Sequence, residues 1–191
     1  MTIGLDATIR IPFGFVKKTL LDISAKNPGV RVVDASAPVL VRTGEFLKVV
    51  NLEVNAGGIM VKPVLTLKPY FEAKDKLAVK IQKVQLHVAA SPDVKAGEPL
   101  FDKEQVMAQV MDTLIPLIMA EVDKAIKAKV PSLKAADVLK LNYDRETWIL
   151  HAEVSMRFIR QFLPADLLGD LHLNGFSFND NTVFVQISTE N

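Results

Sequence analysis

The residues of this sequence best suited to chemistry are three histidines and a set of carboxylates, since cysteine is absent. His87, His151 and His172 each stand opposite to their apolar neighbours in a strand-like alternation, so we expect them to point away from the core. A shared metal needs ligand spacings such as HxH or HExxH, and neither spacing occurs. The sequence therefore predicts solvated histidines, no metal site and no cofactor.

Motifs for nucleophilic catalysis and for phosphate binding are also missing. The sequence has no GxSxG elbow, and its glycine-rich loop at 55–58 lacks the GxxxxGK[ST] and GxGxxG patterns that cradle phosphates. The carboxylate pairs Glu72/Asp75 and Asp166/Asp170 have the spacing of turns or helix faces, without a desolvating setting. We therefore predict that the protein is not an enzyme. A reaction that uses carboxylates, or a cofactor that the sequence does not reveal, stays open as a less favoured hypothesis.

The composition is aliphatic and nearly neutral. Hydrophobic residues make up 49% of the chain and aromatic residues 7%, while 23 basic and 22 acidic side chains give a net charge of +1. Without a positive field we predict no nucleic-acid partner. Lysines gather locally between residues 57 and 90, so a basic strand face with Lys74, Lys76 and Lys80 could contact anionic headgroups. The simpler interpretation of these lysines is a solvated outer face.

The compartment stays open at this stage. The first residues lack the basic segment and apolar run of a secretion signal, and the absence of cysteine suits cytoplasm and periplasm equally. We expect the periplasm or cell envelope if a signal peptide has been removed, and the cytoplasm otherwise. The longest apolar stretches are short and broken by charge, so we expect no transmembrane helix.

The periodicity predicts a single α+β domain over residues 1–191. A short strand at 7–12 precedes a short N-terminal helix at 13–26, where apolar residues recur at helical spacing. Alternating segments then predict strands at 30–34, 39–42, 45–54, 59–73 and 76–88. The apolar face changes parity near Gln82-Lys83, which predicts a β-bulge. Pro63 and Pro69 predict that the strand 59–73 is irregular or lies at an edge.

The most apolar element is a long central helix that begins after Asp102, with Gln105 as its capping-box partner, and ends near Lys129. Residues 106–120 are apolar nearly all round, so we expect this helix to be surrounded on most sides, and Pro116 predicts a kink. Two hairpins follow, at 138–154 and 171–188, around a mixed segment at 156–168 that is compatible with a short helix. Long bulged strands predict a strongly curved antiparallel sheet that wraps the central helix.

The segment 46–67, in which two long strands meet at Asn55-Ala56-Gly57-Gly58, resembles the long-strand repeat of bacterial tubular lipid-binding (TULIP-like) proteins. Those are envelope proteins similar in fold to bactericidal/permeability-increasing protein. Residues 9–25 resemble the opening of the related YceB-like lipoproteins. The resemblance is one of layout. It implies a curved sheet around a long helix, with an apolar groove for acyl chains.

The leading hypothesis is non-catalytic binding of lipid, a fatty acyl chain or another apolar ligand in a groove between the curved sheet and the helix. Methionine adapts to irregular apolar surfaces, and each buried methylene contributes about 0.8 kcal/mol, so few polar anchors are needed. The predicted lining comes from the helix and from facing elements: Met107, Val110, Met111, Leu114, Ile118, Trp148, Phe158 and Phe162. The alternative is a structural or protein-interaction domain in which the same helix lies in a filled core.

Overall fold

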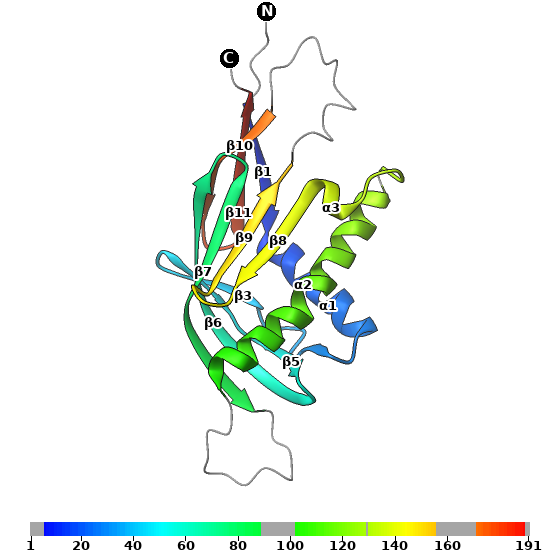
Figure 1. Ribbon diagram of the computed structural model, residues 1–191, viewed down its shortest axis with the longest axis vertical. Coiled ribbons are helices and arrows are strands. Elements are labelled where there is room, and N and C mark those ends of the chain that lie inside the picture. Colours follow the sequence, from blue (N-terminus) through cyan, green and yellow to red (C-terminus); the bar gives the residue numbers. More distant parts are fainter. Residues whose placement is uncertain (1–5, 89–101, 129, 156–170, 190–191) are drawn as a thin grey trace, which may run out of the picture.

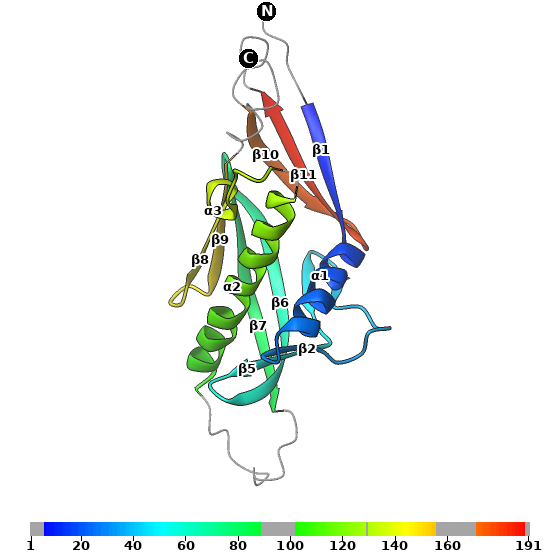
Figure 2. The same cartoon turned by 90° about the vertical axis from the view of Figure 1, so that its right-hand side faces the viewer.

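A computed structural model describes residues 6–88, 102–128, 130–155 and 171–189. Over these residues the chain forms a strongly curled antiparallel sheet, shaped like half a barrel, with a long helix along its inner side (Figures 1 and 2). A short helix lies near the N-terminus. The predicted α+β fold class is thus confirmed.

The helices are α1 (Phe13–Lys26), α2 (Lys103–Lys127) and α3 (Ala135–Val138). The strands are β1 (Asp6–Pro12), β2 (Val30–Val32), β3 (Leu40–Thr43), β4 (Phe46–Val49), β5 (Leu52–Ala56), β6 (Ile59–Ala73), β7 (Lys76–Val88), β8 (Leu139–Asp144), β9 (Ile149–Val154), β10 (Leu171–Phe178) and β11 (Thr182–Thr189). The large sheet has the order β2-β5-β6-β7-β9-β8, and the β3–β4 hairpin also joins it through β6. A second sheet has the order β1-β11-β10.

The long hairpin of β6 and β7 forms the middle of the large sheet and contains the predicted bulge. Thr66 pairs with Lys83 and Leu67 pairs with Ile81, so Gln82 is the extra residue. Before the bulge the odd-numbered residues of β7, such as Ile81, face the inner side of the sheet; after it the even-numbered residues, such as Val84, do so. The inner side therefore stays apolar along the whole strand.

Of the two alternatives predicted for the strand 59–73, the irregular strand is confirmed, because its pairing with β7 shifts register twice, and the edge position is wrong, because β6 has neighbours on both sides. The second side is shared by two short strands, however. β5 pairs with β6 as far as Val61, and β4 pairs with it at residues 65–67. Pro63 and Pro69 fall outside both pairings. Proline has no N–H to donate, so the strand tolerates it where the ladder on one side is interrupted.

The single strand predicted at 45–54 is in fact two strands, β4 and β5, which are separated at Asn51. Asn51 has a φ of 61°, a left-handed conformation that asparagine accepts more readily than most residues. Its side-chain amide donates to the carbonyl of Asp34 at 2.7 Å and accepts from the Asp34 N–H at 2.8 Å. This break lets β4 pair with β3 while β5 pairs with β2.

Helix α2 begins as predicted, since the Asp102 carboxylate accepts a hydrogen bond from the Glu104 N–H at 3.0 Å. It ends at Lys127, two residues before the predicted end, and continues through Pro116 without interruption. The expected burial on most sides holds only for its first half. Buried residues stop at Leu114, and both Pro116 and Ala120 are exposed.

Asp75, in the turn between β6 and β7, joins the two sheets. Its N–H donates to the carbonyl of Leu173 in β10, and its carbonyl accepts from the Val154 N–H in β9. Its carboxylate also accepts from the Leu173 N–H at 2.7 Å. Beside this joint, Leu173 belongs to a buried cluster against which Leu77 and Val154 of the large sheet pack.

The strand break at Asn51 can be tested by substitution. We expect Asn51→Ala to lower the free energy of unfolding by about 2–5 kcal/mol, because a left-handed alanine costs roughly 1–2 kcal/mol and each of the two lost hydrogen bonds with Asp34 about 0.5–1.5 kcal/mol. Asn51→Gly removes the same side-chain bonds but keeps the backbone freedom, so its loss is smaller. Urea denaturation followed by circular dichroism measures both, and equal losses would contradict the backbone part of the argument.

Candidate functional site

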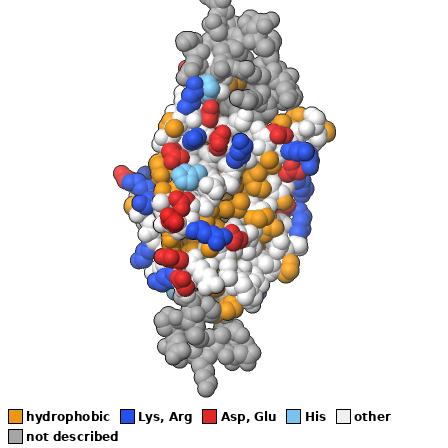
Figure 3. Space-filling model, in the orientation of Figure 1, with side chains coloured by type: hydrophobic (Ala, Val, Ile, Leu, Met, Phe, Trp, Pro, Cys, Tyr) orange, Lys and Arg blue, Asp and Glu red, His pale blue; other side chains and the backbone are white. Residues whose placement is uncertain are grey.

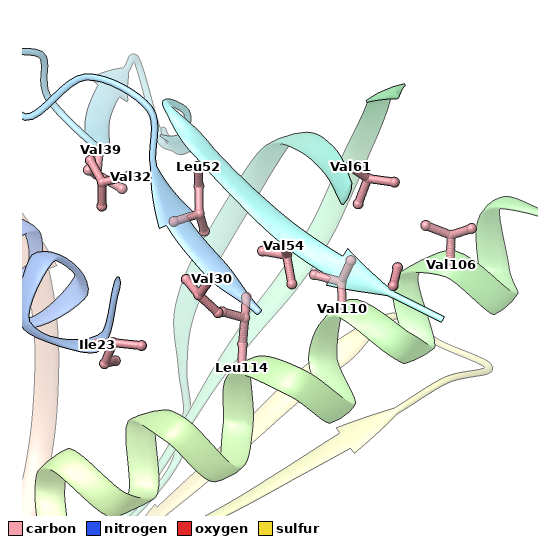
Figure 4. Close-up of a cluster of buried hydrophobic side chains, with 11 residues drawn as sticks. Ile23, Val30, Val32, Val39, Leu52, Val54, Val61, Val106, Val110 and Leu114 are labelled. Atoms are coloured by element: carbon pink, nitrogen blue, oxygen red, sulfur yellow. The ribbon is translucent and has the colours of Figure 1, made fainter. Parts of the chain in front are cut away.

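The predicted lining residues lie in two separate clusters on α2. Met107 and Met111 pack with Leu65 and Ile81 of the sheet, and Trp148 joins this cluster from the β8–β9 turn. Val110, Leu114 and Ile118 belong to the other cluster, which includes buried residues of α1, β2 and β5. Figure 4 shows the second cluster, with the Val110 and Leu114 side chains directed toward β2 and β5. Phe158 and Phe162 lie outside the described residues.

The first half of α2 is packed as a filled core. Met107 and Val110 are 0% exposed, so neither solvent nor a water-sized void touches them. On the β5 side the approach is close: the Thr113 hydroxyl donates to the Asn55 carbonyl at 3.2 Å. A Cβ at Gly57 would lie 2.9 Å from the side-chain oxygen of Gln109. The backbone of α2 lies close to those of β5, α3 and α1.

The second half of α2 is different, because its apolar side chains are only half covered. Met119 and Val122 continue, at helical spacing, the stripe of Met111 and Ile115 that faces the β8–β9 side of the sheet. Alternate residues of β8 are also apolar and half-buried, and Tyr143 packs in the same cluster as Ile115. We call these residues the α2–β8 seam: Ile115, Met119, Val122, Leu139, Leu141 and Tyr143. In Figure 3 hydrophobic side chains form a band over this region.

Polar contacts mark the two ends of the seam. At one end the Arg145 guanidinium binds both carboxylate oxygens of Asp112 at 2.9 and 3.1 Å and so ties the β8–β9 turn to α2. At the other end the Ala135 N–H of α3 donates to Asp123 at 2.9 Å. With a helical rise of 1.5 Å per residue, the distance along α2 from Asp112 to Asp123 is roughly 16 Å.

The charged groups of this region stay at the ends of the seam. The pKa of Asp123 is lowered, chiefly by its hydrogen bond with Lys127 and then by the Ala135 amide, so its carboxylate is ionised at neutral pH. The Thr147 hydroxyl and the Glu146 amide lower the pKa of Asp144 in the same way. Burial raises the pKa of Tyr143, which keeps its hydroxyl neutral. The seam residues themselves therefore carry no charge.

Trp148 stands beside the Arg145 end of the seam and is the only tryptophan of the sequence. Its φ of 58° is a left-handed conformation that bulky residues rarely adopt. The Trp148 carbonyl accepts a hydrogen bond from the Ile81 N–H at 2.9 Å, and the ring packs with Met107 and Met111. These contacts hold the strained turn, and they place a fluorescent side chain near the seam.

The histidines are less solvated than the sequence predicts. His87 is exposed, but His151 lies 3.1 Å from a carboxylate oxygen of Glu72, and His172 lies 2.8 Å from a carboxylate oxygen of Asp75. In the part of the chain that the structure describes, no group of three or more histidines or carboxylates is arranged to hold a metal ion. The histidine pairs join strands: His151 in β9 to β6, and His172 in β10 to the β6–β7 turn.

By length and composition alone α2 would pass for a membrane-spanning helix. The core helix of a water-soluble protein meets the same criterion. Here the first half of α2 is enclosed by the large sheet and α1, with the buried residues Val106, Met107, Ala108, Val110, Met111 and Leu114. We therefore treat α2 as a core helix.

Comparison of the chain with models of protein families, with curated proteins and with solved structures gives no match. The resemblance to tubular lipid-binding proteins rests on the layout of the sequence and stays a prediction. The α2–β8 seam is the central feature of the candidate site.

Proposed function

We propose that the protein binds an acyl chain or a similar apolar ligand, without catalysis, along the α2–β8 seam. The proposal is supported by half-buried apolar side chains at helical spacing on α2 and at alternate positions of β8, of which Ile115 and Tyr143 pack in one cluster. Apolar side chains that remain partly accessible on adjacent elements are a feature of ligand and partner sites. A chain lying between α2 and β8 would bury those side chains, at about 0.8 kcal/mol for each methylene removed from water.

The proposed binding site lies further along α2 than the lining predicted from the sequence, which begins at Met107. Met107 and Val110 are completely enclosed by protein, so they support the site from below and do not touch the ligand. Met111 and Trp148 lie where the filled core meets the seam. The uncharged seam, about 16 Å long, suits a linear chain whose polar end lies near one of the charged ends.

The second candidate is a protein-interaction domain with a filled core. The complete burial of Met107 and Val110 favours it, because it shows that much of α2 needs no ligand to be covered. In that case the seam would receive apolar side chains of a protein partner. The two candidates differ in whether the purified protein binds a small apolar molecule.

We expect Met119→Glu to weaken binding of a fluorescent fatty acid at least about tenfold, because a carboxylate beside the chain must be desolvated when the ligand binds. Ala120→Glu is the matched control: it adds the same charge at the next position of α2, which is exposed. Its affinity should stay near that of the unchanged protein. Titration of the fatty acid, with Trp148 emission as a second signal, measures both variants.

Native mass spectrometry of the purified protein complements this titration. A copurified lipid, or saturable binding of the fatty acid that Met119→Glu impairs and Ala120→Glu does not, supports the proposal. Absence of any lipid together with absence of fatty-acid binding would contradict it and favour the interaction domain. Equal losses in the two glutamate variants would place the ligand away from the seam.

We expect Met107→Ala to lower the free energy of unfolding by about 2–5 kcal/mol, the usual cost of emptying a filled methionine site. Met119→Ala should cost clearly less, because Met119 is only partly buried. Denaturation with urea in the absence of ligand compares the two. A loss below roughly 1 kcal/mol for Met107→Ala would indicate that the core beside it is loosely packed.

A further inference from the structure

The face of the large sheet turned away from α2 carries lysines in adjacent rows. On β6 the inward residues include Val61 and Leu65, which are buried, so the alternate residues Lys62 and Lys68 point outward. Strand pairing then places the other cations of this face. Lys68 stands directly opposite Lys80, and Lys48 and Lys83 flank Thr66 from the two neighbouring strands. We call the resulting group the basic face: Arg31, Lys48, Lys62, Lys68, Lys80 and Lys83.

Glu53 is the carboxylate set among these cations, and the fold removes it from the surface. Its side chain is only 2% exposed. Arg31 Nε donates to one carboxylate oxygen at 2.7 Å, and Lys62 Nζ lies 3.2 Å from the other without good hydrogen-bond geometry. Glu53 therefore neutralises cations at one margin of the basic face and offers no negative charge to a partner.

The remaining cations repel one another. Among the described residues Lys48, Lys68, Lys80 and Lys83 form no ion pair within 4.0 Å. Like charges directly opposite each other, such as Lys68 and Lys80, destabilise a sheet. An anionic partner on this face would reduce the repulsion.

We propose that the basic face docks on the surface of an anionic lipid bilayer. The sheet curls around α2, so this face is convex (Figure 2), whereas proteins that hold single-stranded nucleic acid use a positively charged groove. Lysines spread over a convex surface suit the diffuse charge of lipid headgroups. The inference rests on the proposed function, because bilayers are the main store of acyl chains and docking on one would bring the protein to its ligand. Docking through this face leaves the α2–β8 seam uncovered.

The structure changes the set of lysines that the sequence indicates for such a contact. Lys80 belongs to the basic face. Lys76 stands directly opposite Glu153, and Lys74 lies in a turn whose sequence also contains Glu72 and Asp75, so acidic residues accompany both lysines. The excess of positive charge lies further along β6 and β7, away from this turn.

The test is cosedimentation of the full chain with vesicles of phosphatidylcholine alone or of phosphatidylcholine with a quarter phosphatidylglycerol. We expect binding to the anionic vesicles only, and binding that weakens as salt is raised. Lys68→Glu/Lys80→Glu should lower the partition coefficient at least about tenfold, since each lysine near an anionic surface is worth roughly a fivefold change. Lys18→Glu/Lys103→Glu, with the same change of charge at exposed positions on α1 and α2, should bind almost normally.

Equal binding to neutral and anionic vesicles, no binding to either, or equal losses in the two double variants would overturn the proposal. So would tighter binding to single-stranded nucleic acid that displaces the vesicles. Fatty-acid titration without vesicles separates this inference from the proposed function. Lys68→Glu/Lys80→Glu should leave that titration unchanged, whereas Met119→Glu should impair it and still bind anionic vesicles.

Discussion

The close contact between α2 and β5 determines how the rest of the structure is arranged. Val54 and Val110 meet there without exposed surface, the Thr113 hydroxyl donates to the β5 backbone, and Gly57 leaves room for Gln109. The covering of α2 is uneven along its length, because the buried residues of the helix all lie between Val106 and Leu114. The first half of α2 is therefore enclosed, while its second half faces β8 with apolar side chains that remain half covered.

The bulge at Gln82 gives the large sheet two faces of opposite character. Before it, Ile81 points inward and Lys80 outward; after it, Val84 points inward and Lys83 outward. Without the extra residue the second half of β7 would turn its lysine toward α2 and its valine toward water. The apolar inner side that supports the seam and the basic outer side thus depend on the same local irregularity, even though they would serve different partners.

Structural features that depend on a few neighbouring residues can be predicted from the sequence, and features that depend on residues distant in the sequence cannot. The Asp102 cap and the Gln82 bulge follow from local spacing, and the structure has both. The break at Asn51 was missed because alternation continues across it and the hydrogen bonds that favour it come from Asp34. The interior place of β6 was missed because two short strands share its second side. For the candidate site, the sequence identified an apolar helix but could not show which half is covered, since this depends on the distance from α2 to β5 and β8.

The two halves of α2 contribute differently to the stability of the fold. Stability depends mainly on completely buried side chains, and Met107, Val110 and their neighbours provide them without any ligand. The Arg145–Asp112 ion pair and the contact of α3 with Asp123 lie at the two ends of the seam, and the exposed ion pair adds at most about 1 kcal/mol. The seam can leave its apolar side chains half covered while the fold persists. A ligand or partner that covered these side chains would remove their remaining apolar surface from water, and this burial would contribute to its affinity.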